Sequence, residues 1–443
     1  MGISIYGEDS INGEFIAPSS KPQTQRALIM AALSDGTSTI RWPLRSRETA
    51  IMIDACHSVG AKVTQFEDRF IVDGIGAGPG GSRDTAGRAG MRYIWAGGSA
   101  LVARLFLTIG SALPENIVVD GTCNLRVRPF EPLIAALKDK GVELSFFDTQ
   151  RRLPCTVTST SFPGGNFQLG TDISSQFVTS LLTSAPLAVN PLSIELTGSH
   201  YSLSYIKQTT DMMANFGVTA TTGDDMRQIT VTDGQDYRAT DIEIDGDYTS
   251  ASYILGAAFV TRGHIKLRNL DPNSLQGERA VVSILAQLGA RVRWIEDGRT
   301  IDLDCTGLPT RIDTSFDLSD SPNILPTVAA IVATIHGSVR ITGGRLTQNH
   351  KSPRIEAIAQ ELGKAGVSVQ ILKSQDGAID GLRVDGAERH NGDIVFSNHG
   401  DHRITMALML FALACRNPCS FHEDLDTMDS FPGFTEFLGL SVK

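Results

Sequence analysis

Two cations stand at the start of an apolar run near the beginning of the chain. Lys21 and Arg26 lie just before residues 27–33, and Ser19 and Ser20 precede them. Either serine can cap a helix that begins here, and the free N–H groups at a helix start attract anions. The stretch therefore predicts a binding site for an anionic group. Taken alone, it also fits a helix start with two solvated cations.

The elements that would position such a site repeat along the chain. One sequence motif occurs six times: the end of an apolar helix, a glycine, a small apolar residue and then a strand in which apolar and polar residues alternate. Glycine suits the helix end because it accepts the left-handed backbone, and period-two alternation is typical of a strand. The copies begin at residues 59, 140, 216, 288, 365 and 438. Six copies predict two domains, each made of three small α/β units.

A second, more apolar helix is expected within the units. Its candidates are residues 101–109, 177–187, 251–260, 323–334 and 405–414. Helices this apolar should be buried against strands and other helices.

The composition narrows the class of protein. A chain of 443 residues is too long for one ordinary core, so two or more domains are expected. A hydrophobic content of 41% and a charged content of 20% are typical of a soluble globular protein. The net charge of −10 argues against a general nucleic-acid surface, although it permits a local basic pocket.

The cysteines and the hydrophobic runs bear on metal, compartment and membrane. Cys415 and Cys419 have no nearby His or second Cys pair, which argues against zinc and favours free thiols in a reducing compartment. The N-terminus lacks a basic region followed by an apolar stretch, and no run reaches transmembrane length. We expect a cytoplasmic protein with no membrane partner, no metal and no organic cofactor.

The first stretch has a counterpart in a known family. Residues 18–33 read P-S-S-K-P-Q-T-Q-R-A-L-I-M-A-A-L. This resembles the P-G-S-K-S-x-x-x-R-A-L-x-x-A-A-L signature of the 5-enolpyruvylshikimate-3-phosphate (EPSP) synthases. These enzymes are the enolpyruvyl, or carboxyvinyl, transferases of the shikimate pathway in aromatic amino acid biosynthesis. Lys21 and Arg26 match the signature, whereas Pro22 replaces the serine that follows the lysine.

Further motifs resemble the family in the same order along nearly the whole chain. They are G-D-x-S-L-R-x-R-P at residues 121–129, S-S-Q-F at 174–177, G-D-x-S-S-A-S-Y at 246–253, D-L-S-D-A-P-D-L-L-P-T at 317–327, K-E-S-D-R-I-E-A-I at 350–358, D-H-R at 401–403 and K-S-F-P-G-F at 429–434. Each match is weak by itself, but their shared order identifies the chain as a member of the family.

The resemblance implies a fold. It is an α/β fold of two similar domains, each with three βαββαβ repeats, known as the inside-out α/β barrel of the enolpyruvyl transferases. Residues 1–20 and 243–443 would form one discontinuous domain, and residues 21–242 would form an inserted domain. The active site would be the cleft between them, a location that suits closure around a substrate.

The resemblance also assigns binding residues. Arg128 falls on the arginine that holds the phosphoenolpyruvate side, and with Arg354 and Arg403 it would bind a second small anion, because arginine pairs with carboxylate or phosphate at two points. Separate surface arginines are the alternative. The residues that would hold a phosphorylated or otherwise anionic shikimate-like ring are Lys21, Arg26, Ser174, Ser175, Gln176, Ser202 and Tyr205. In isolation, the two serines before the apolar helix would fit a plain N-cap.

Four positions depart from the acid–base groups of the family. The family reaction protonates the methylene of phosphoenolpyruvate, adds a ring hydroxyl and then eliminates phosphate, so it needs groups that transfer protons. The family aspartate is Asn323 here, and an amide cannot act as a general base at neutral pH. The family Lys-Glu pair is His350-Lys351, and the lysine before S-F-P is Asp429. Lys351 and Asp429 exchange the family's signs, so we expect them to pair with each other.

The sequence thus predicts an EPSP-synthase-like transferase, a monomer that acts on small anionic substrates through changed or specialised chemistry. His350, Lys351, Asp429 and Asn323 would occupy its catalytic places. Two alternatives stay open: an authentic 3-phosphoshikimate 1-carboxyvinyltransferase that uses phosphoenolpyruvate, and a non-catalytic anion-binding paralogue. The sister family that acts on UDP-N-acetylglucosamine fits less well, because its catalytic cysteine loop has no counterpart.

Overall fold

The chain divides into two compact units. The computed structural model describes residues 4–7, 10–77, 90–158, 161–199, 201–223, 225–295, 298–422 and 427–439. Unit 1 comprises the described residues of 1–19 and 245–443, and unit 2 comprises those of 20–244. These limits lie one or two residues from the expected domain limits. Each unit has its own cluster of buried apolar side chains.

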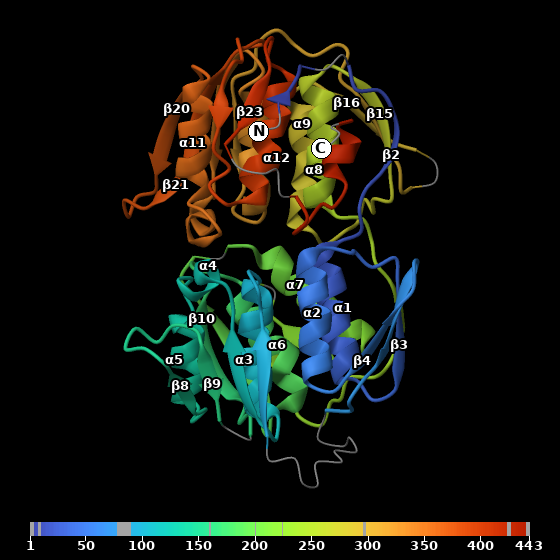
Figure 1. Ribbon diagram of the computed structural model, residues 1–443, viewed down its shortest axis with the longest axis vertical. Coiled ribbons are helices and arrows are strands. Elements are labelled where there is room, and N and C mark those ends of the chain that lie inside the picture. The colour runs from blue at the N-terminus through green and yellow to red at the C-terminus, as the bar shows by residue number, and fades with distance from the viewer. Residues whose placement is uncertain are drawn as a thin grey trace. The chain divides into compact units, whose positions relative to one another are not determined.

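Unit 2 alternates helices with short strands (Figure 1). Its helices are α1 (Lys21–Leu33), α2 (Arg47–Ser58), α3 (Ala100–Ala112), α4 (Cys123–Arg126), α5 (Glu131–Asp139), α6 (Gln176–Ser184), the 3-10 helix η1 (Ala185–Leu187) and α7 (Leu203–Asn215). Its strands are β3 (Thr37–Arg41), β4 (Lys62–Gln65), β5 (Arg69–Asp73), β6 (Met91–Trp95), β7 (Asn116–Asp120), β8 (Leu144–Phe146), β9 (Cys155–Val157), β10 (Gly165–Gly170), β11 (Leu192–Thr197), β12 (Ala220–Thr222), β13 (Gln228–Val231) and β14 (Asp241–Glu243).

Unit 1 is built in the same manner. Its helices are α8 (Tyr248–Val260), η2 (Gly277–Arg279), α9 (Ala280–Gln287), η3 (Pro322–Ile324), α10 (Leu325–Val332), η4 (Arg345–Asn349), α11 (Arg354–Lys364), α12 (His402–Leu413) and α13 (Phe434–Phe437). Its strands are β1 (Ser4–Ile5), β2 (Gly13–Ile16), β15 (His264–Arg268), β16 (Arg291–Trp294), β17 (Ile301–Asp304), β18 (Thr314–Asp317), β19 (Gly337–Thr342), β20 (Ser368–Lys373), β21 (Ile379–Gly386), β22 (Val395–Phe396) and β23 (Cys419–Phe421).

One strand pattern recurs in the sheets. In the sheet β10-β11-β13-β12 the first two strands are parallel, and β13 is antiparallel to both of its neighbours. The sheets β6-β7-β9-β8, β14-β3-β5-β4, β2-β15-β17-β16 and β18-β19-β21-β20 follow the same pattern. A sixth sheet, β22-β23-β1, has a parallel and an antiparallel pair within the described residues. Each sheet therefore represents one copy of the repeat.

The order of elements within a repeat differs from the expected one. The elements run β-α-β-α-β-β, as in β10, α6, β11, α7, β12 and β13. The expected order βαββαβ is wrong in this detail, although the α/β class with two similar halves is correct. Both helices join strands that run in the same direction, which requires a crossover, whereas only the antiparallel pair β12–β13 is joined by a short turn.

Two sheets take their first strand from a distant part of the chain. β14 pairs in parallel with β3, so the end of unit 2 completes the sheet nearest its beginning. β2 pairs in parallel with β15 and completes a sheet of unit 1. Each of these strands runs directly into a helix of the other unit, β2 into α1 and β14 into α8. The chain thus passes between the units twice, each time from a strand into a buried helix.

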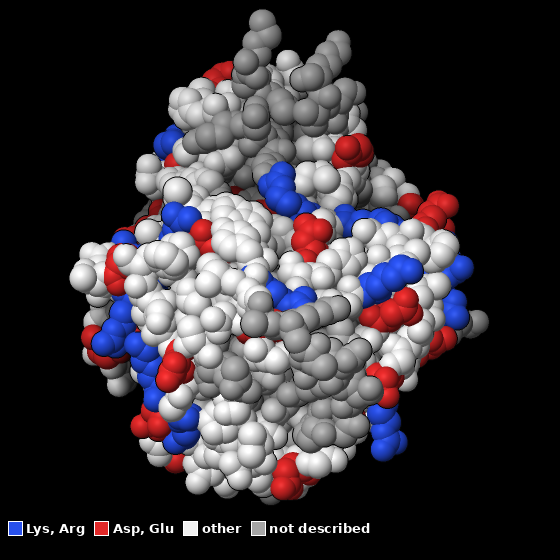
Figure 2. Space-filling model, turned by 60° about the horizontal axis from the view of Figure 1, so that its bottom comes forward, with Lys and Arg blue, Asp and Glu red and all other residues white. Residues whose placement is uncertain are grey.

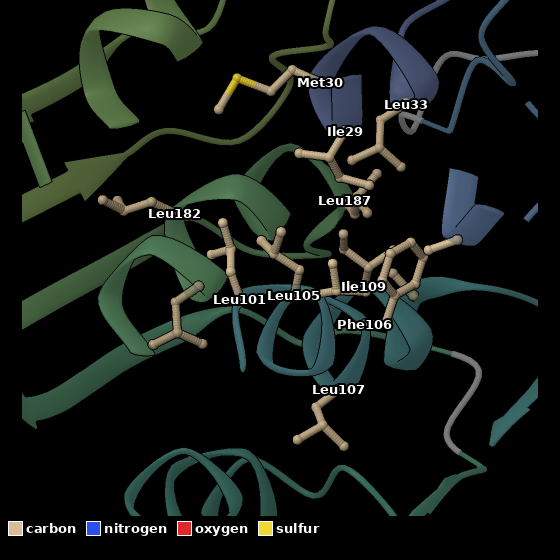
Figure 3. Packing of buried hydrophobic residues seen from close by; sticks show 14 of the residues in the cluster. Ile29, Met30, Leu33, Leu101, Leu105, Phe106, Leu107, Ile109, Leu182 and Leu187 are labelled. Carbon is tan, nitrogen blue, oxygen red and sulfur yellow. The ribbon is translucent and has the colours of Figure 1, made fainter. Parts of the chain in front are cut away.

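The helices that follow the first strands form the centre of each unit. Every residue of α3, α8, α10 and α12 is buried. Figure 3 shows side chains of α1 and α3, among them Ile29, Met30, Leu105 and Ile109, gathered in the core of unit 2. The strands of the sheets alternate between buried and exposed residues, as in β15. The apolar runs predicted helices that are buried against strands and other helices, and the structure has this arrangement. The five expected second helices are also confirmed.

The first helix is longer than its apolar run. α1 begins at Lys21, six residues before the predicted run, because Ser20 caps it and Pro22 lies in its first turn. None of the helices in the described ranges is long and apolar enough to cross a bilayer.

Candidate active site

Lys21 opens α1, and a carboxylate of the next helix balances its charge. Its Nζ donates to Oε2 of Glu48 on α2 at 2.9 Å, and the two side chains are only 11% and 12% exposed. The Ser20 side chain accepts from the backbone N–H of Gln23 and so caps α1. An anion that binds at this helix start therefore meets a cation already held in an ion pair.

Arg26 is deeply buried among neutral oxygen atoms. Its side chain leaves α1 toward α7, and the whole residue is 2% exposed. Nε donates to Oγ1 of Thr209 at 2.9 Å, and the two terminal nitrogens donate to the carbonyls of Pro22 and Tyr205 at 3.0 and 3.2 Å. Burial lowers the pKa of Arg26 to about 10. Within the described part of the chain no carboxylate contacts this guanidinium.

The start of α6 carries three of the predicted ring-binding residues. Ser174 and Gln176 are half-buried, and both accept from the same guanidinium nitrogen, Nη1 of Arg104 on α3, at 2.9 and 2.8 Å. Oγ of Ser174 also accepts from the backbone N–H of Gln176 at 3.2 Å. Ser175 precedes the helix but makes no side-chain cap hydrogen bond. A side-chain N-cap therefore does not explain the presence of Ser175. Ser174 and Gln176 are connected through Arg104, which donates to both.

The other predicted residues of unit 2 lie near the ends of helices. Ser202 precedes α7 in the left-handed backbone conformation (φ 54°) and is 3% exposed. Tyr205 lies in the first turn of α7, and its ring lies beneath the guanidinium of Arg26 at 5.9 Å. Arg128 is half-buried and follows the short helix α4. The structure thus brings Arg26 and Tyr205 together, and Ser174 and Gln176 together.

In unit 1 the carboxylate of Asp401 organises the predicted residues. It caps α12, is fully buried, and accepts from Nε and Nη2 of Arg354 at 2.7 and 3.2 Å. It also accepts from Oγ of Ser352 and from the backbone N–H of Arg403. Burial alone would raise the pKa of Asp401, but the positive charges of Arg354 and His402 and the hydrogen bonds hold it far below its usual range. Arg354 is therefore neutralised by a two-point ion pair within the protein.

Asn323 lies between an arginine and a second carboxylate. Its Oδ1 accepts from Nη1 of Arg354 at 3.1 Å, and its Nδ2 donates to Oε1 of Glu278 at 3.2 Å. Glu278, on η2, is 1% exposed. Nη1 of Arg354 also lies 2.8 Å from Nδ1 of His350, and because arginine can only donate, this nitrogen of His350 must accept. His350 is therefore neutral here and carries its proton on Nε2.

The expected pairing of Lys351 with Asp429 is confirmed. Nζ of Lys351 donates to Oδ2 of Asp429, and the two side chains are 17% and 14% exposed. Nδ1 of His402 lies 3.8 Å from the carboxylates of both Asp401 and Asp429. Arg354 thus joins Asn323, His350 and Asp401 through hydrogen bonds, while Lys351 and Asp429 form a separate pair, and His402 lies near both carboxylates but beyond hydrogen-bond distance.

Three residues of these networks were missed by the motif comparison. Glu278 and Arg104 carry no local signal, because their partners lie 45 and about 70 residues away in the sequence. Asp401 is part of the D-H-R motif, where only its arginine was assigned a role. A buried carboxylate next to a buried arginine becomes apparent only when both are placed in space.

Metal ligands are absent from the described ranges, where no group of three or more His, Cys, Asp or Glu residues could hold a metal ion. All six cysteines are free thiols, and only Cys123 is exposed.

Figure 2 shows Lys and Arg side chains interspersed with Asp and Glu on one face of the molecule.

Comparison with known proteins decides the family. The family model described as EPSP synthase (3-phosphoshikimate 1-carboxyvinyltransferase) matches residues 5–438. The chain belongs to the EPSP synthase family. Proteins named 3-phosphoshikimate 1-carboxyvinyltransferase from Methanosphaera stadtmanae and Methanosarcina acetivorans are each 32% identical to it, covering 99% and 100% of this chain and 99% of each relative. An EPSP synthase structure from Acinetobacter baumannii superposes with a TM-score of 0.77 at 21% identity, covering 99% of this chain and 97% of that one.

Membership of this family makes the protein a transferase of the carboxyvinyl class with the two-domain enolpyruvyl transferase fold. The family match spans the described elements from β1 to α13, so Asn323, His350, Lys351 and Asp429 all lie within it.

Proposed function

We propose that this protein transfers the enolpyruvyl group of phosphoenolpyruvate to a hydroxyl of a phosphorylated or otherwise anionic shikimate-like ring, using acid–base groups that differ from those of its family. The hydroxyl oxygen adds to C2 of phosphoenolpyruvate while the methylene gains a proton. Loss of a methyl proton then expels phosphate and leaves an enol ether. Two proton transfers are therefore required, and each needs a positioned group.

Binding of the anionic ring is assigned to unit 2. The support is a buried guanidinium, that of Arg26, whose described contacts include no carboxylate. A buried charge without a partner is costly, so a chain that keeps one normally uses it to bind an opposite charge. The residues proposed to hold the ring are Lys21, Arg26, Ser174, Ser175, Gln176, Ser202 and Tyr205, and those proposed for the second anion are Arg128, Arg354 and Arg403.

Proton transfer is assigned to unit 1. The single observation that carries the proposal of altered chemistry is the ion pair of Lys351 with Asp429, in which the charges are the reverse of the family's Glu and Lys. Asn323 holds Glu278 by a hydrogen bond, so a carboxylate is still present beside the amide that cannot serve as a base. His350, Lys351 and Asp429 are the proposed replacements for the family groups, with Asn323 and Glu278 completing the set.

The test is phosphate release by the purified protein. Shikimate 3-phosphate and phosphoenolpyruvate are supplied together, and an ordinary EPSP synthase is measured in parallel. A missing acid–base group costs on the order of 10² to 10⁴ in rate, so we expect release at least about a hundredfold below that of the ordinary enzyme. Release at the ordinary rate would refute the altered chemistry while leaving the transferase assignment intact.

A second candidate is an authentic 3-phosphoshikimate 1-carboxyvinyltransferase whose catalytic groups have moved. It is favoured by the names of the relatives, which match this chain over nearly its full length. Growth of a strain that lacks its own synthase, when this chain is supplied, would select this candidate. Binding of shikimate 3-phosphate without any turnover would instead point to a non-catalytic paralogue. The monomeric state and the cytoplasmic location stay predictions.

A further inference from the structure

Arg104 is the cation of unit 2 that no motif pointed to. It lies in the middle of α3, a helix whose other residues are apolar or small, and it is 4% exposed. Its guanidinium lies over the rings of Phe177 and Phe130, with distances of 4.7 and 5.4 Å to the ring centroids. A charged side chain at such a position requires an explanation, because burial of a charge is among the costliest features of a protein interior.

No carboxylate among the described residues neutralises the charge of Arg104. Nη1 of Arg104 donates to Ser174 and Gln176, Nη2 donates to the carbonyl of Pro129 at 3.0 Å, and Nε is buried with no hydrogen-bond partner in the described ranges. All three acceptors are neutral. Burial, together with a smaller effect of the positive charge of Arg128, lowers the pKa of Arg104 to about 9.

A second arginine of unit 2 shows the more usual arrangement, in which a carboxylate pairs with the guanidinium. Arg92, on β6 of the same unit, donates to the Glu115 carboxylate, which is 7% exposed. The buried carboxylate of Glu115 therefore has a partner of opposite sign in the half-buried Arg92, as is usual for a buried charge. Aromatic rings offset part of the cost of burying Arg104 through cation–π contacts, but they supply no counter-charge.

The hydrogen bonds of Arg104 set the direction of two neighbouring side chains. A hydroxyl has two lone pairs and one hydrogen. Oγ of Ser174 accepts both from Arg104 and from the backbone N–H of Gln176, so its hydrogen is the one group left for a ligand. The amide oxygen of Gln176 faces Arg104, so its NH₂ group is turned the other way. Both half-buried side chains are thus held as donors, and donors select phosphate or carboxylate oxygens.

We propose that Arg104 is a positioning residue for anion binding: by accepting no counter-charge of its own and by orienting the hydroxyl of Ser174 and the amide of Gln176 as donors, it tunes the start of α6 for the phosphate or carboxylate of the substrate. The inference rests on the proposed function, which makes Ser174 and Gln176 binding residues. The arginine acts through these two side chains and through its charge.

The experiment compares Arg104→Met with Arg92→Met in the full-length chain. Thermal melting and calorimetric titration with shikimate 3-phosphate and with inorganic phosphate are measured for each. Because Arg104→Met removes a buried charge that has no counter-charge, we expect an unchanged or higher melting temperature and an affinity for both probes about tenfold to a hundredfold weaker. Arg92→Met leaves Glu115 buried without its partner, so it should melt earlier and bind both probes as wild type does.

A thermodynamic cycle separates positioning from a merely structural role. In a Ser174→Ala/Gln176→Ala background, Arg104→Met should weaken binding by less than about threefold, because the side chains through which it acts are gone. Arg104→Lys, which keeps the charge but not the fork, should recover only part of the affinity. Wild-type affinity of Arg104→Met overturns the inference, as does a parallel loss of melting temperature and affinity.

Failure of the proposed function has a different signature. If the wild type binds inorganic phosphate but not shikimate 3-phosphate, the ring assignment is wrong, and the Arg104 inference is then judged on phosphate alone. If the wild type binds neither probe, both are overturned.

Discussion

At the scale of single residues, the charges of the candidate site fall into two kinds. Arg354 and Lys351 each have a carboxylate partner, Asp401 and Asp429, within hydrogen-bond distance. Arg26, in contrast, contacts only neutral oxygen atoms within the described ranges. A paired cation must share its carboxylate partner with an anion that binds there, whereas a cation without a counter-charge is directly available to the anion.

The reversed pair Lys351–Asp429 leads to a prediction on activity. In the double variant Lys351→Glu/Asp429→Lys the family signs return and the pair can still form. We expect phosphate release from shikimate 3-phosphate and phosphoenolpyruvate to rise at least about tenfold above wild type, because a correctly charged proton-transfer group contributes that much or more. Each single variant should have a lower melting temperature than both the wild type and the double variant, since it places two like charges together.

A matched control for this swap lies in the same unit. Arg311 and Asp313 form an exposed pair at 2.7 Å, and Arg311→Glu/Asp313→Arg should change neither phosphate release nor melting. If the site double variant is no faster than wild type, the proposal that this pair alters the chemistry is wrong.

Asp401 leads to a prediction on pH. Its pKa is far below the value near 3.9 of an unfolded aspartate, so at low pH the unfolded state binds more protons than the folded state. Its contribution to stability is thus complete above about pH 5 and falls as the pH falls. Asp401→Asn should cost about 3–5 kcal/mol at pH 7, because it leaves Arg354 buried without its partner.

Urea unfolding of wild type and variant between pH 7 and pH 3 checks this. Their difference in free energy of unfolding should narrow by about 1 kcal/mol for each pH unit below 4. Asp376→Asn, at an exposed carboxylate paired with Arg345, should leave the unfolding midpoint at pH 7 nearly unchanged. A difference between wild type and Asp401→Asn that stays constant with pH would contradict the assignment.

At the scale of elements, unit 1 depends on the close approach of its central helices. A Cβ added at Gly256 of α8 would lie 2.9 Å from Leu410 of α12 and 3.1 Å from Ile331 of α10. Glycine thus permits these helices to meet without a gap, and the same packing places the N-terminus of α12, where Asp401 lies. The repeat explains part of this arrangement, since α10 and α12 each follow the first strand of their own sheet, whereas α8 follows β14 of unit 2.

This packing predicts opposite outcomes for two helical glycines. Gly256→Val should destabilise unit 1 by about 1–3 kcal/mol, because the added methyl groups overpack the contact between helices. Gly363 of α11 has nothing within 4 Å of an added Cβ, and Gly363→Ala should stabilise by about 0.5–1 kcal/mol through better helix propensity. Denaturant midpoints of the two variants check this, and equal effects would show that the helix contact is not the constraint.

At the scale of the whole molecule, the two passages of the chain define the units. β14 completes the sheet of β3, although Asp241 and Thr39 are far apart in the sequence. Unit 2 therefore contains all the strands of its sheets, and residues 20–244 should fold by themselves.

Shortening this fragment tests the role of β14. Residues 20–240 lack β14 and the buried Ile244, and should melt at least about 5 °C below residues 20–244, from the lost apolar burial and the unpaired edge of β3. Melting followed by circular dichroism measures this. Equal melting temperatures would mean that β14 is not needed to complete the unit.

Local patterns were sufficient to predict much of the architecture. Apolar runs predicted the buried helices, and the recurring motif with glycine after a helix predicted the repeats. The ordered family motifs identified the family. Each of these signals lies within a few residues of sequence. The order of elements in a repeat was wrong, because it was inferred from the family resemblance and not from the helix and strand patterns of this chain.

What the sequence determined by itself is which charges and hydroxyls the chain carries and on which elements they lie. Only the tertiary structure decided their state: that Glu48 balances Lys21, that Asp401 balances Arg354, and that Asn323 holds Glu278. The physical reason is that a charge's state depends on its burial and on partners within a few ångströms. Those partners, such as Asp401 for Arg354 at a separation of 47 residues, are brought near only by folding.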